Sequence, residues 1–273
     1  MCEACGSQIH VRASALTRRR ALALGAGLIG ALAAPLRALA DAPDKPPPKP
    51  ENVVSPEEAL ARLMEGNARY VAGVAKRHDF VAEREALVGG QNPFAAVLSC
   101  ADSRIAPELA FDSGRGDLFV CRVAGNFVTP DNLASFEYAV DLLKTPLFMV
   151  LGHESCGAVK AAIAAVVDKA SLPGHLPALV AGIGPAVEAV ANQGGDLLAN
   201  ATRENVRRNV ETLKTATPIL SAAVAEGRIQ VVGGTYRVFV GDASDLAHLP
   251  LRGQVRLAPA VLGANSGPAP ASA

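Results

Sequence analysis

The chain has 273 residues, half of them hydrophobic, and its 26 basic side chains balance its 26 acidic ones. This length and apolar content are sufficient for one substantial hydrophobic core. The balanced charge gives no indication of a nucleic-acid partner, because proteins that bind nucleic acids usually carry a basic surplus.

The first 40 residues have the composition of an export signal. Three arginines at 18–20 precede an apolar run at 21–34, and an A-x-A cleavage pattern follows at 38–40. The run of 14 residues is shorter than the roughly 20 that span a membrane, which favours a cleaved signal over a retained anchor. The arginine pair directly before the run is similar to a twin-arginine signal. We therefore expect a signal peptide over 1–40, periplasmic location and no stable membrane anchor after cleavage.

A folded domain is expected from residue 55 to about 260. Residues 41–54 form a proline-rich, charged linker in their first part, which predicts an extended tether. Ser55 then supplies a helix N-cap, followed by proline and two glutamates, and the apolar spacing predicts a helix through about Val71.

Short apolar runs and longer helical stretches alternate in the rest of the domain. Strands are predicted at 94–99, 117–123, 146–151 and 228–235, and helices at 131–143, 157–168, 175–192 and 202–225, the last broken near Pro218. This pattern predicts an α/β fold with a central, mostly parallel sheet of about four strands flanked by helices. The run at 253–258 suggests an additional edge strand, 242–252 resembles an insertion, and 261–273 a disordered tail.

Five cysteines occur, and cleavage after residue 40 would remove the two at positions 2 and 5. The remaining three, Cys100, Cys121 and Cys156, argue against a disulfide framework in an exported protein and leave thiols for metal binding. Cys121 lies inside an apolar strand run, where a buried core residue is the ordinary interpretation and a metal ligand the less favoured one.

Three potential metal ligands are expected at the carboxyl ends of strands, where ligand sites of open α/β sheets form. Cys100 follows one apolar run, and His153 and Cys156 follow another, three residues apart at the opening of a helix. The spacing predicts that both side chains lie on one face of the first helical turn. Two thiolates and one imidazole with an open fourth position are a recognised catalytic zinc arrangement, so we expect one zinc ion per chain.

Four segments resemble the beta carbonic anhydrases, in the right order and within residues 55–240. They are Cys100–Glu108 (CADSRIAPE), Asp117–Asn126 (DLFVCRVAGN), Phe136–Val140 (FEYAV) and Gly152–Gly157 (GHESCG). The resemblance implies that Cys100, His153 and Cys156 bind zinc, and that zinc-bound hydroxide attacks carbon dioxide to give bicarbonate and a proton. It also implies that Asp102 and Arg104 form a dyad that orients the hydroxide, although a surface salt bridge is the simpler interpretation of that pair alone.

The resemblance further implies a substrate pocket and an assembly. Gln91 would reach the zinc pocket of a partner subunit, and Phe119, Ala124 and Tyr138 would line an apolar slot, although Phe119 and Tyr138 could equally be core residues. The chain would then be at least a homodimer, and dimers of this family often pair into tetramers. Gln91, and the lack of a tryptophan at the position of Val97, favour an open zinc site over one closed by the aspartate.

Other functions stay open at this point. A few relatives hydrolyse carbon disulfide or carbonyl sulfide with the same ligands, and a non-catalytic zinc-binding protein would need only the ligands themselves. His78 and His175 are candidates for a proton shuttle, although surface histidines without a role are the more ordinary interpretation. Val123 and the Tyr236-Arg237 pair depart from the family pattern without touching an expected ligand.

Overall fold

The computed structural model describes residues 54–238 and 255–258. The expected signal peptide, the linker before Val54, the insertion at 242–252 and the tail at 261–273 lie outside the described residues. The chain divides into two units, 1–44 and 45–273, and all described residues belong to the second.

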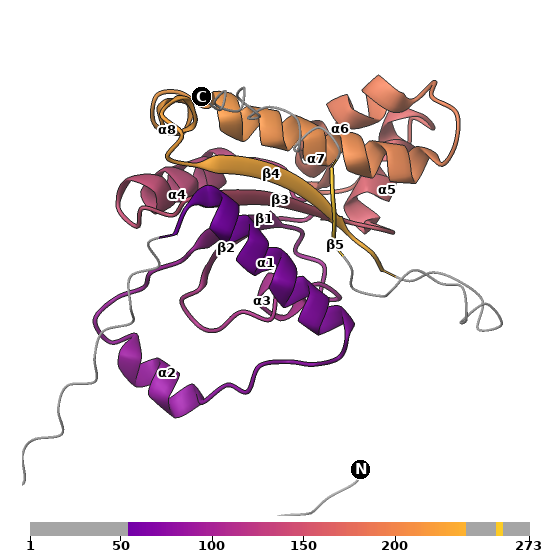
Figure 1. Cartoon of the computed structure of the whole chain (residues 1–273). Coiled ribbons are helices and arrows are strands. Elements are labelled where there is room, and N and C mark those ends of the chain that lie inside the picture. Colours follow the sequence, from indigo (N-terminus) through magenta and orange to yellow (C-terminus); the bar gives the residue numbers. More distant parts are fainter. Residues whose placement is uncertain (1–53, 239–254, 259–273) are drawn as a thin grey trace, which may run out of the picture. The chain divides into compact units, whose positions relative to one another are not determined.

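A five-stranded sheet in the order β2-β1-β3-β4-β5 forms the centre of this second unit (Figure 1). Its strands are β1 (Ala95–Ser99), β2 (Leu118–Arg122), β3 (Leu147–His153), β4 (Gln230–Tyr236) and β5 (Val255–Leu257). The first four strands are parallel and β5 runs antiparallel to β4. The predicted α/β fold, with a mostly parallel sheet and one edge strand, is therefore confirmed.

Eight helices are described around the sheet. They are α1 (Pro56–Val71), α2 (Phe80–Ala86), α3 (Pro107–Ala110), α4 (Pro130–Asp141), α5 (Gly157–Val166), α6 (Leu176–Val190), α7 (Leu197–Thr215) and α8 (Ile219–Ala225). The predicted start of α1 is confirmed, because Ser55 and Glu58 form a capping box. The short helices α2 and α3 were not predicted.

The helix predicted at 202–225 is wrong at its start. α7 begins five residues earlier, at Leu197, because the side chain of Asp196 caps it by accepting hydrogen bonds from the amides of Leu198 and Ala199. The expected break near Pro218 is confirmed, since α7 ends at Thr215 and α8 starts at Ile219.

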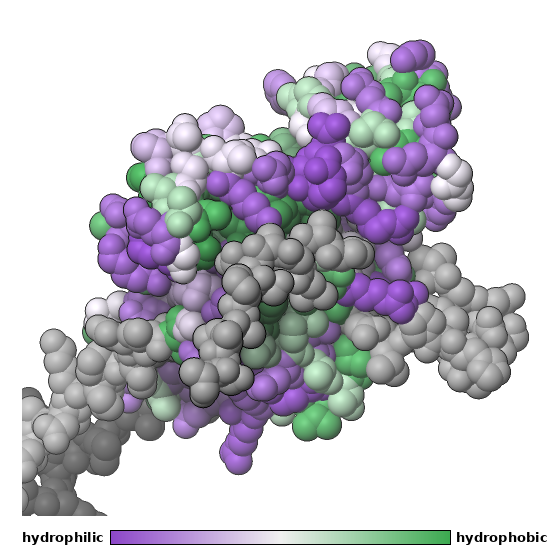
Figure 2. Space-filling model, turned by 45° about the horizontal axis from the view of Figure 1, so that its top comes forward, coloured by the Kyte–Doolittle hydropathy of each residue, from purple (hydrophilic) through white to green (hydrophobic). Residues whose placement is uncertain are grey.

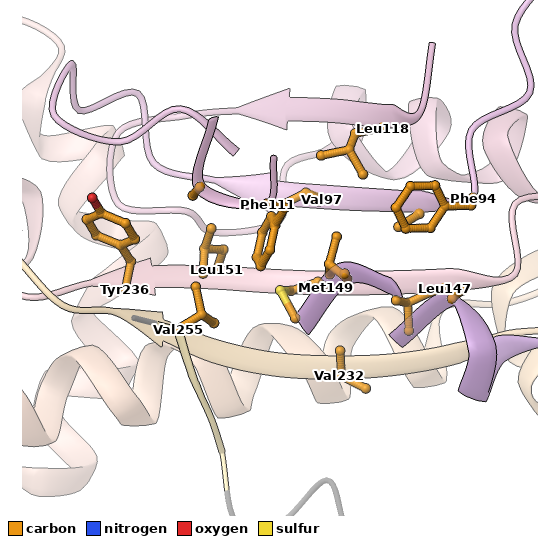
Figure 3. Packing of buried hydrophobic residues seen from close by; sticks show 14 of the residues in the cluster. Phe94, Val97, Phe111, Leu118, Leu147, Met149, Leu151, Val232, Tyr236 and Val255 are labelled. Carbon is orange, nitrogen blue, oxygen red and sulfur yellow. The ribbon is translucent and has the colours of Figure 1, made fainter. Parts of the chain in front are cut away.

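Both faces of the sheet are covered, as the alternation along β3 shows. Leu147, Met149 and Leu151 point to the face covered by α1, where Figure 3 shows them among other apolar side chains. Phe148 and Val150 point to the opposite face and join a cluster with residues of α4, α7 and α8. Burial on both faces explains why the strands are continuous apolar runs.

The helices above the sheet in Figure 1 include α5, α6 and α7, and apolar residues of these three pack together in a third cluster. Figure 2 brings this layer forward and shows mainly hydrophilic residues on its outer surface. Within the described residues, every helix is too short or too polar to cross a membrane. The third cluster matters for function, because it contains Cys100 and Cys156.

Candidate metal centre

Three potential ligands converge at the carboxyl edge of the parallel sheet. Cys100 directly follows β1, His153 is the last residue of β3, and Cys156 is the N-cap of α5. Strands β1 and β3 are neighbours, with Ser99 paired to Leu151, so the two ligand-bearing segments leave the sheet side by side. Parallel strand order alone therefore brings residues 53 positions apart to one place.

The local geometry of His153 and Cys156 differs from the prediction. The expectation that both residues lie on the first turn of a helix is wrong, because His153 belongs to the strand and Cys156 precedes the first helical residue. Ser155 between them has a φ of 56°, in the left-handed region. A tight turn, and not helical periodicity, brings the imidazole and the thiol together.

The three side chains have the dimensions of a metal site. Their ligand atoms all lie within 4.8 Å of one another, and the Sγ atoms of Cys100 and Cys156 are 3.9 Å apart. Two sulfurs at about 2.3 Å from a tetrahedral zinc ion would be about 3.8 Å apart. All three residues are buried, and among residues 54–238 and 255–258 no other such group of ligands occurs.

The tautomer of His153 supports this interpretation. Its Nδ1 lies 2.9 Å from the carbonyl oxygen of Glu154 and donates a hydrogen bond to it, which leaves the lone pair on Nε2. Nε2 is buried and has no hydrogen-bond partner among the described groups. An unpaired buried acceptor is costly, and a cation between Nε2 and the two sulfurs would satisfy it. The residues present therefore fit a bound zinc ion.

The two thiols influence each other. Hydrogen bonds from Cys156 and from the amide of Gly125 lower the pKa of Cys100 well below its ordinary value, although burial acts in the opposite direction. The same contact with Cys100, together with burial, raises the pKa of Cys156, although the amides at the start of α5 act in the opposite direction. Ionisation of one thiol thus opposes ionisation of the other, and a divalent cation bound by both sulfurs would stabilise both as thiolates.

Asp102 and Arg104 form a two-pronged ion pair beside this cluster. Arg104 donates from Nε to Oδ1 of Asp102 at 2.9 Å and from Nη2 to Oδ2 at 2.7 Å. These hydrogen bonds from Arg104 hold the pKa of Asp102 below its usual range. Oδ2 lies 3.8 Å from Nε2 of His153, so an ionised carboxylate faces the position where the three ligands converge. Arg104 also donates to the carbonyl of Ser155, which links the two ligand-bearing segments.

Arg122, the last residue of β2, was not predicted to have a role. Its Nε donates to the carbonyl of Cys100, and its Nη2 donates to the carbonyls of Asp102 and Ile105, at 2.8–2.9 Å. One guanidinium therefore ties down the loop that carries both a ligand and the dyad. The sequence could have indicated this role, because Arg122 is a charged residue at the end of an apolar run, at the edge of the sheet where the ligands were expected.

The expected pocket residues do not gather around the cluster within one chain. Gln91 is exposed beyond the amino end of β1, where it lines a cavity of about 420 Å³, so the length of the strand separates it from Cys100. Phe119 stacks with Tyr138 at a centroid distance of 6.2 Å, and pairs in register with Ala96 near the start of β1. Ala124 alone lies next to the site, since the amide of its neighbour Gly125 contacts Cys100.

The remaining candidates lie elsewhere. Cys121 is buried in the cluster on the α4 face of the sheet, as expected of a core residue, and burial raises the pKa of its thiol. His78 pairs with Glu83, 2.7 Å away, beside α2, and His175 is the N-cap residue of α6. Neither position is one of the buried ligand group at the carboxyl edge of the sheet.

This fold and ligand set define the class of beta-type carbonic anhydrases, and comparisons with known proteins agree. The family described as "Carbonic anhydrase" matches residues 95–243. Carbonic anhydrase 2 of Mycobacterium tuberculosis is 39% identical over 190 residues, covering 69% of this chain and 92% of its own. The carbonic anhydrase of Mycolicibacterium smegmatis is 37% identical over 203 residues, covering 74% and 98%.

Solved structures give the same result. The beta-carbonic anhydrase CcaA is 28% identical with a TM-score of 0.50, and covers 65% of this chain and 90% of its own. The beta-carbonic anhydrase of Coccomyxa, solved with acetazolamide, is 28% identical with a TM-score of 0.51, and covers 65% and 82%. The chain therefore belongs to the beta class of the carbonic anhydrase family, and it is an enzyme.

Proposed function

We propose that this enzyme hydrates carbon dioxide reversibly to bicarbonate and a proton at a zinc ion held by Cys100, His153 and Cys156. The observation that carries the proposal is the buried, unpaired Nε2 of His153 facing two sulfurs 3.9 Å apart. When bound, zinc would lower the pKa of a coordinated water and supply the nucleophile near neutral pH.

Asp102 would orient that nucleophile. Its carboxylate stays ionised because Arg104 lowers its pKa, and so it can accept a hydrogen bond from a water held by the three ligands. Both of its oxygens accept hydrogen bonds from Arg104, which restrain the carboxylate in its position beside the three potential ligands. This contact supports an open site, with room for water and substrate.

A stopped-flow assay with a pH indicator tests the reaction, using the full chain with bound zinc quantified. We expect rapid hydration with about one zinc per chain, and a loss of both after removal of the metal by a chelator. Asp102→Asn should keep its zinc and lose about a hundredfold in kcat, because the amide cannot replace an ionised acceptor. A fully zinc-loaded chain that does not hydrate carbon dioxide would refute the proposal.

We also propose that the enzyme is at least a dimer and that Gln91 acts in the site of a partner subunit. Within one chain Gln91 is far from the ligands, and the residues from Val74 to Val88 expose apolar side chains that a partner would cover. A solved relative with 22% identity is described as tetrameric, which applies to that protein alone.

Subunit complementation tests this assembly. A Gln91→Ala chain and a Cys156→Ala chain should each be weak alone, and their mixed dimer should recover one complete site. If Gln91 acted within its own chain, mixing would restore nothing. Sedimentation velocity of the wild type gives the size of the assembly, and a monomer active at nanomolar concentration would contradict the proposal.

Export to the periplasm is the third part of the proposal, and it rests on the sequence of residues 1–40. Replacing the arginines at 18, 19 and 20 by lysines should retain the protein in the cytoplasm if the twin-arginine pathway carries it. Cell fractionation with an N-terminal sequence of the exported form would show both location and cleavage site. Unchanged fractionation of the triple variant would exclude this pathway.

A further inference from the structure

Gly125 makes a contact with a ligand that depends on its backbone conformation. Its amide donates a hydrogen bond to Sγ of Cys100 at 3.2 Å. Its φ is +88°, a conformation that residues with a Cβ rarely adopt, and a Cβ here would lie 2.4 Å from Cδ1 of Ile183 and 3.2 Å from Cβ of Ala158, so this position favours glycine. Glycine is conformationally permissive, and the direction of its amide must therefore be fixed by other groups.

Asn205 of α7 supplies that restraint from a distant part of the sequence. Its Nδ2 donates to the carbonyl oxygen of Gly125 at 2.8 Å, and the side chain is buried. The two peptide groups that flank Gly125 are then held on both sides, one by Asn205 and the other by Cys100. Rotation about the backbone of Gly125 would break one of these hydrogen bonds, so Asn205 stabilises the orientation that serves the sulfur.

Asn209, one helical turn further along α7, fixes the orientation of Asn205. Its Nδ2 donates to Oδ1 of Asn205 at 3.1 Å, which leaves Nδ2 of Asn205 directed at Gly125. Its Oδ1 accepts from the amide of Val128 at 2.7 Å, which holds the far end of the same loop. A buried network whose members are all satisfied specifies one arrangement, and here that arrangement ends on a ligand sulfur.

We propose that Asn205 is a positioning residue for the metal site, acting through Gly125 on the Cys100 thiolate. A hydrogen bond to a ligating sulfur withdraws electron density from it and directs its lone pairs, and loss of such outer contacts typically weakens metal binding. The inference rests on the proposed zinc binding. It adds a residue of α7, more than a hundred positions from Cys100, to the groups that determine that binding.

The test is Asn205→Ala in the full chain, with two readouts that do not depend on turnover. Chelator competition should show zinc binding about tenfold weaker than in the wild type. In the cobalt-substituted protein the thiolate-to-metal charge-transfer band should move to longer wavelength, because a sulfur without its hydrogen bond is a stronger electron donor.

Val210→Ala is the matched control, since Val210 is buried on the same helix and packs over Gly233 instead of the loop. It should lower the melting temperature without changing zinc affinity or the band. Wild-type values for folded Asn205→Ala, or equal shifts in both variants, would overturn the proposal.

If Asn205→Ala does not fold, Asn209→Ala provides the test. This change removes the hydrogen bond that orients Asn205 but keeps the Asn205 amide that donates to Gly125. A smaller shift in the same direction supports the role, and wild-type values refute it. A wild type that binds no zinc would instead refute the proposed function.

Discussion

The two segments that carry the proposed zinc ligands are held in different ways. The turn from His153 to Cys156 continues β3 and leads into α5, and the amide of Glu154 donates to the carbonyl of Tyr236 at the end of β4. The loop that begins at Cys100 is tied to the chain just after β2 by a hydrogen bond from the amide of Ala101 to the carbonyl of Val123, but it contains only a four-residue helix. The side chain of Arg122 and the amide of Gly125 supply further contacts.

This difference shows where the precision of the site originates. The end of β3 and the tight turn through Ser155 position His153 and Cys156, so their geometry follows mainly from the backbone. Cys100 and Asp102 depend on Arg122, a residue of another strand, which donates to three carbonyls of their loop. We therefore expect the Cys100 loop to be the more easily displaced half of the site.

The largest loss of activity is expected from replacing either cysteine, and it should be equally large in both segments. Cys100→Ser and Cys156→Ser each remove a thiolate that compensates the metal charge, so both should lose bound zinc and fall to the activity of the zinc-free protein. Metal analysis and stopped-flow hydration check this. If one variant kept both zinc and activity, that cysteine would not be a ligand and the two-segment site would be wrong.

The sheet could be predicted from sequence because its strands are continuous apolar runs bounded by turns. β1 is one residue shorter than predicted at its start and β2 one residue shorter at each end, whereas β3 extends two residues beyond its predicted end, to include His153. The start of α7 was missed although Asp196, a good N-cap residue, marks it. The N-cap preference that identified the start of α1 could therefore also have identified the start of α7.

The site was predictable only where residue type reveals chemistry. Cysteine and histidine at strand ends indicate a metal, and an aspartate two residues from an arginine suggests a pair. Arg122 and Asn205 donate to backbone carbonyls, which every residue has. The sequence around the accepting residue therefore does not show which side chain will bind it. Gln91 could not be placed for another reason, since its expected function involves a second subunit.

A pair of arginine variants should separate the two segments. Arg122→Lys keeps the charge but cannot donate to three carbonyls in fixed directions, so kcat should fall about tenfold. Arg237→Lys is the matched change beside the other segment, where Arg237 contacts Glu154 at 3.3 Å, and its effect should be less than about twofold. Hydration kinetics with quantified zinc provide the measurement, and equal losses would show that both segments depend on side chains.

The smallest effect on activity is expected at Asp112, which follows α3 at the far end of the Cys100 loop and forms an ion pair with Arg69 of α1. Its carboxylate accepts from Nε of Arg69 at 2.6 Å and from the amide of Lys76 at 3.0 Å. Burial alone would raise the pKa of Asp112, but these contacts outweigh it and lower the pKa. Asp112→Asn should reduce the free energy of unfolding by about 2 kcal/mol near neutral pH, with hydration activity within about twofold of the wild type.

The loss of stability in Asp112→Asn should depend on pH in a defined direction. Because the folded pKa of Asp112 is lowered, its contribution is present in full above the ordinary aspartate pKa of about 3.9 and is lost as pH falls toward the folded value. The free energies of unfolding of wild type and variant, measured with denaturant from pH 7 to pH 3, should therefore approach each other as the pH falls below about 4. If Asp112→Asn instead lowered kcat by as much as Arg122→Lys, the geometry of the Cys100 loop would depend on its contact with α1 as well as on Arg122, and the contrast between the two segments would be larger than the contacts around Cys100 indicate.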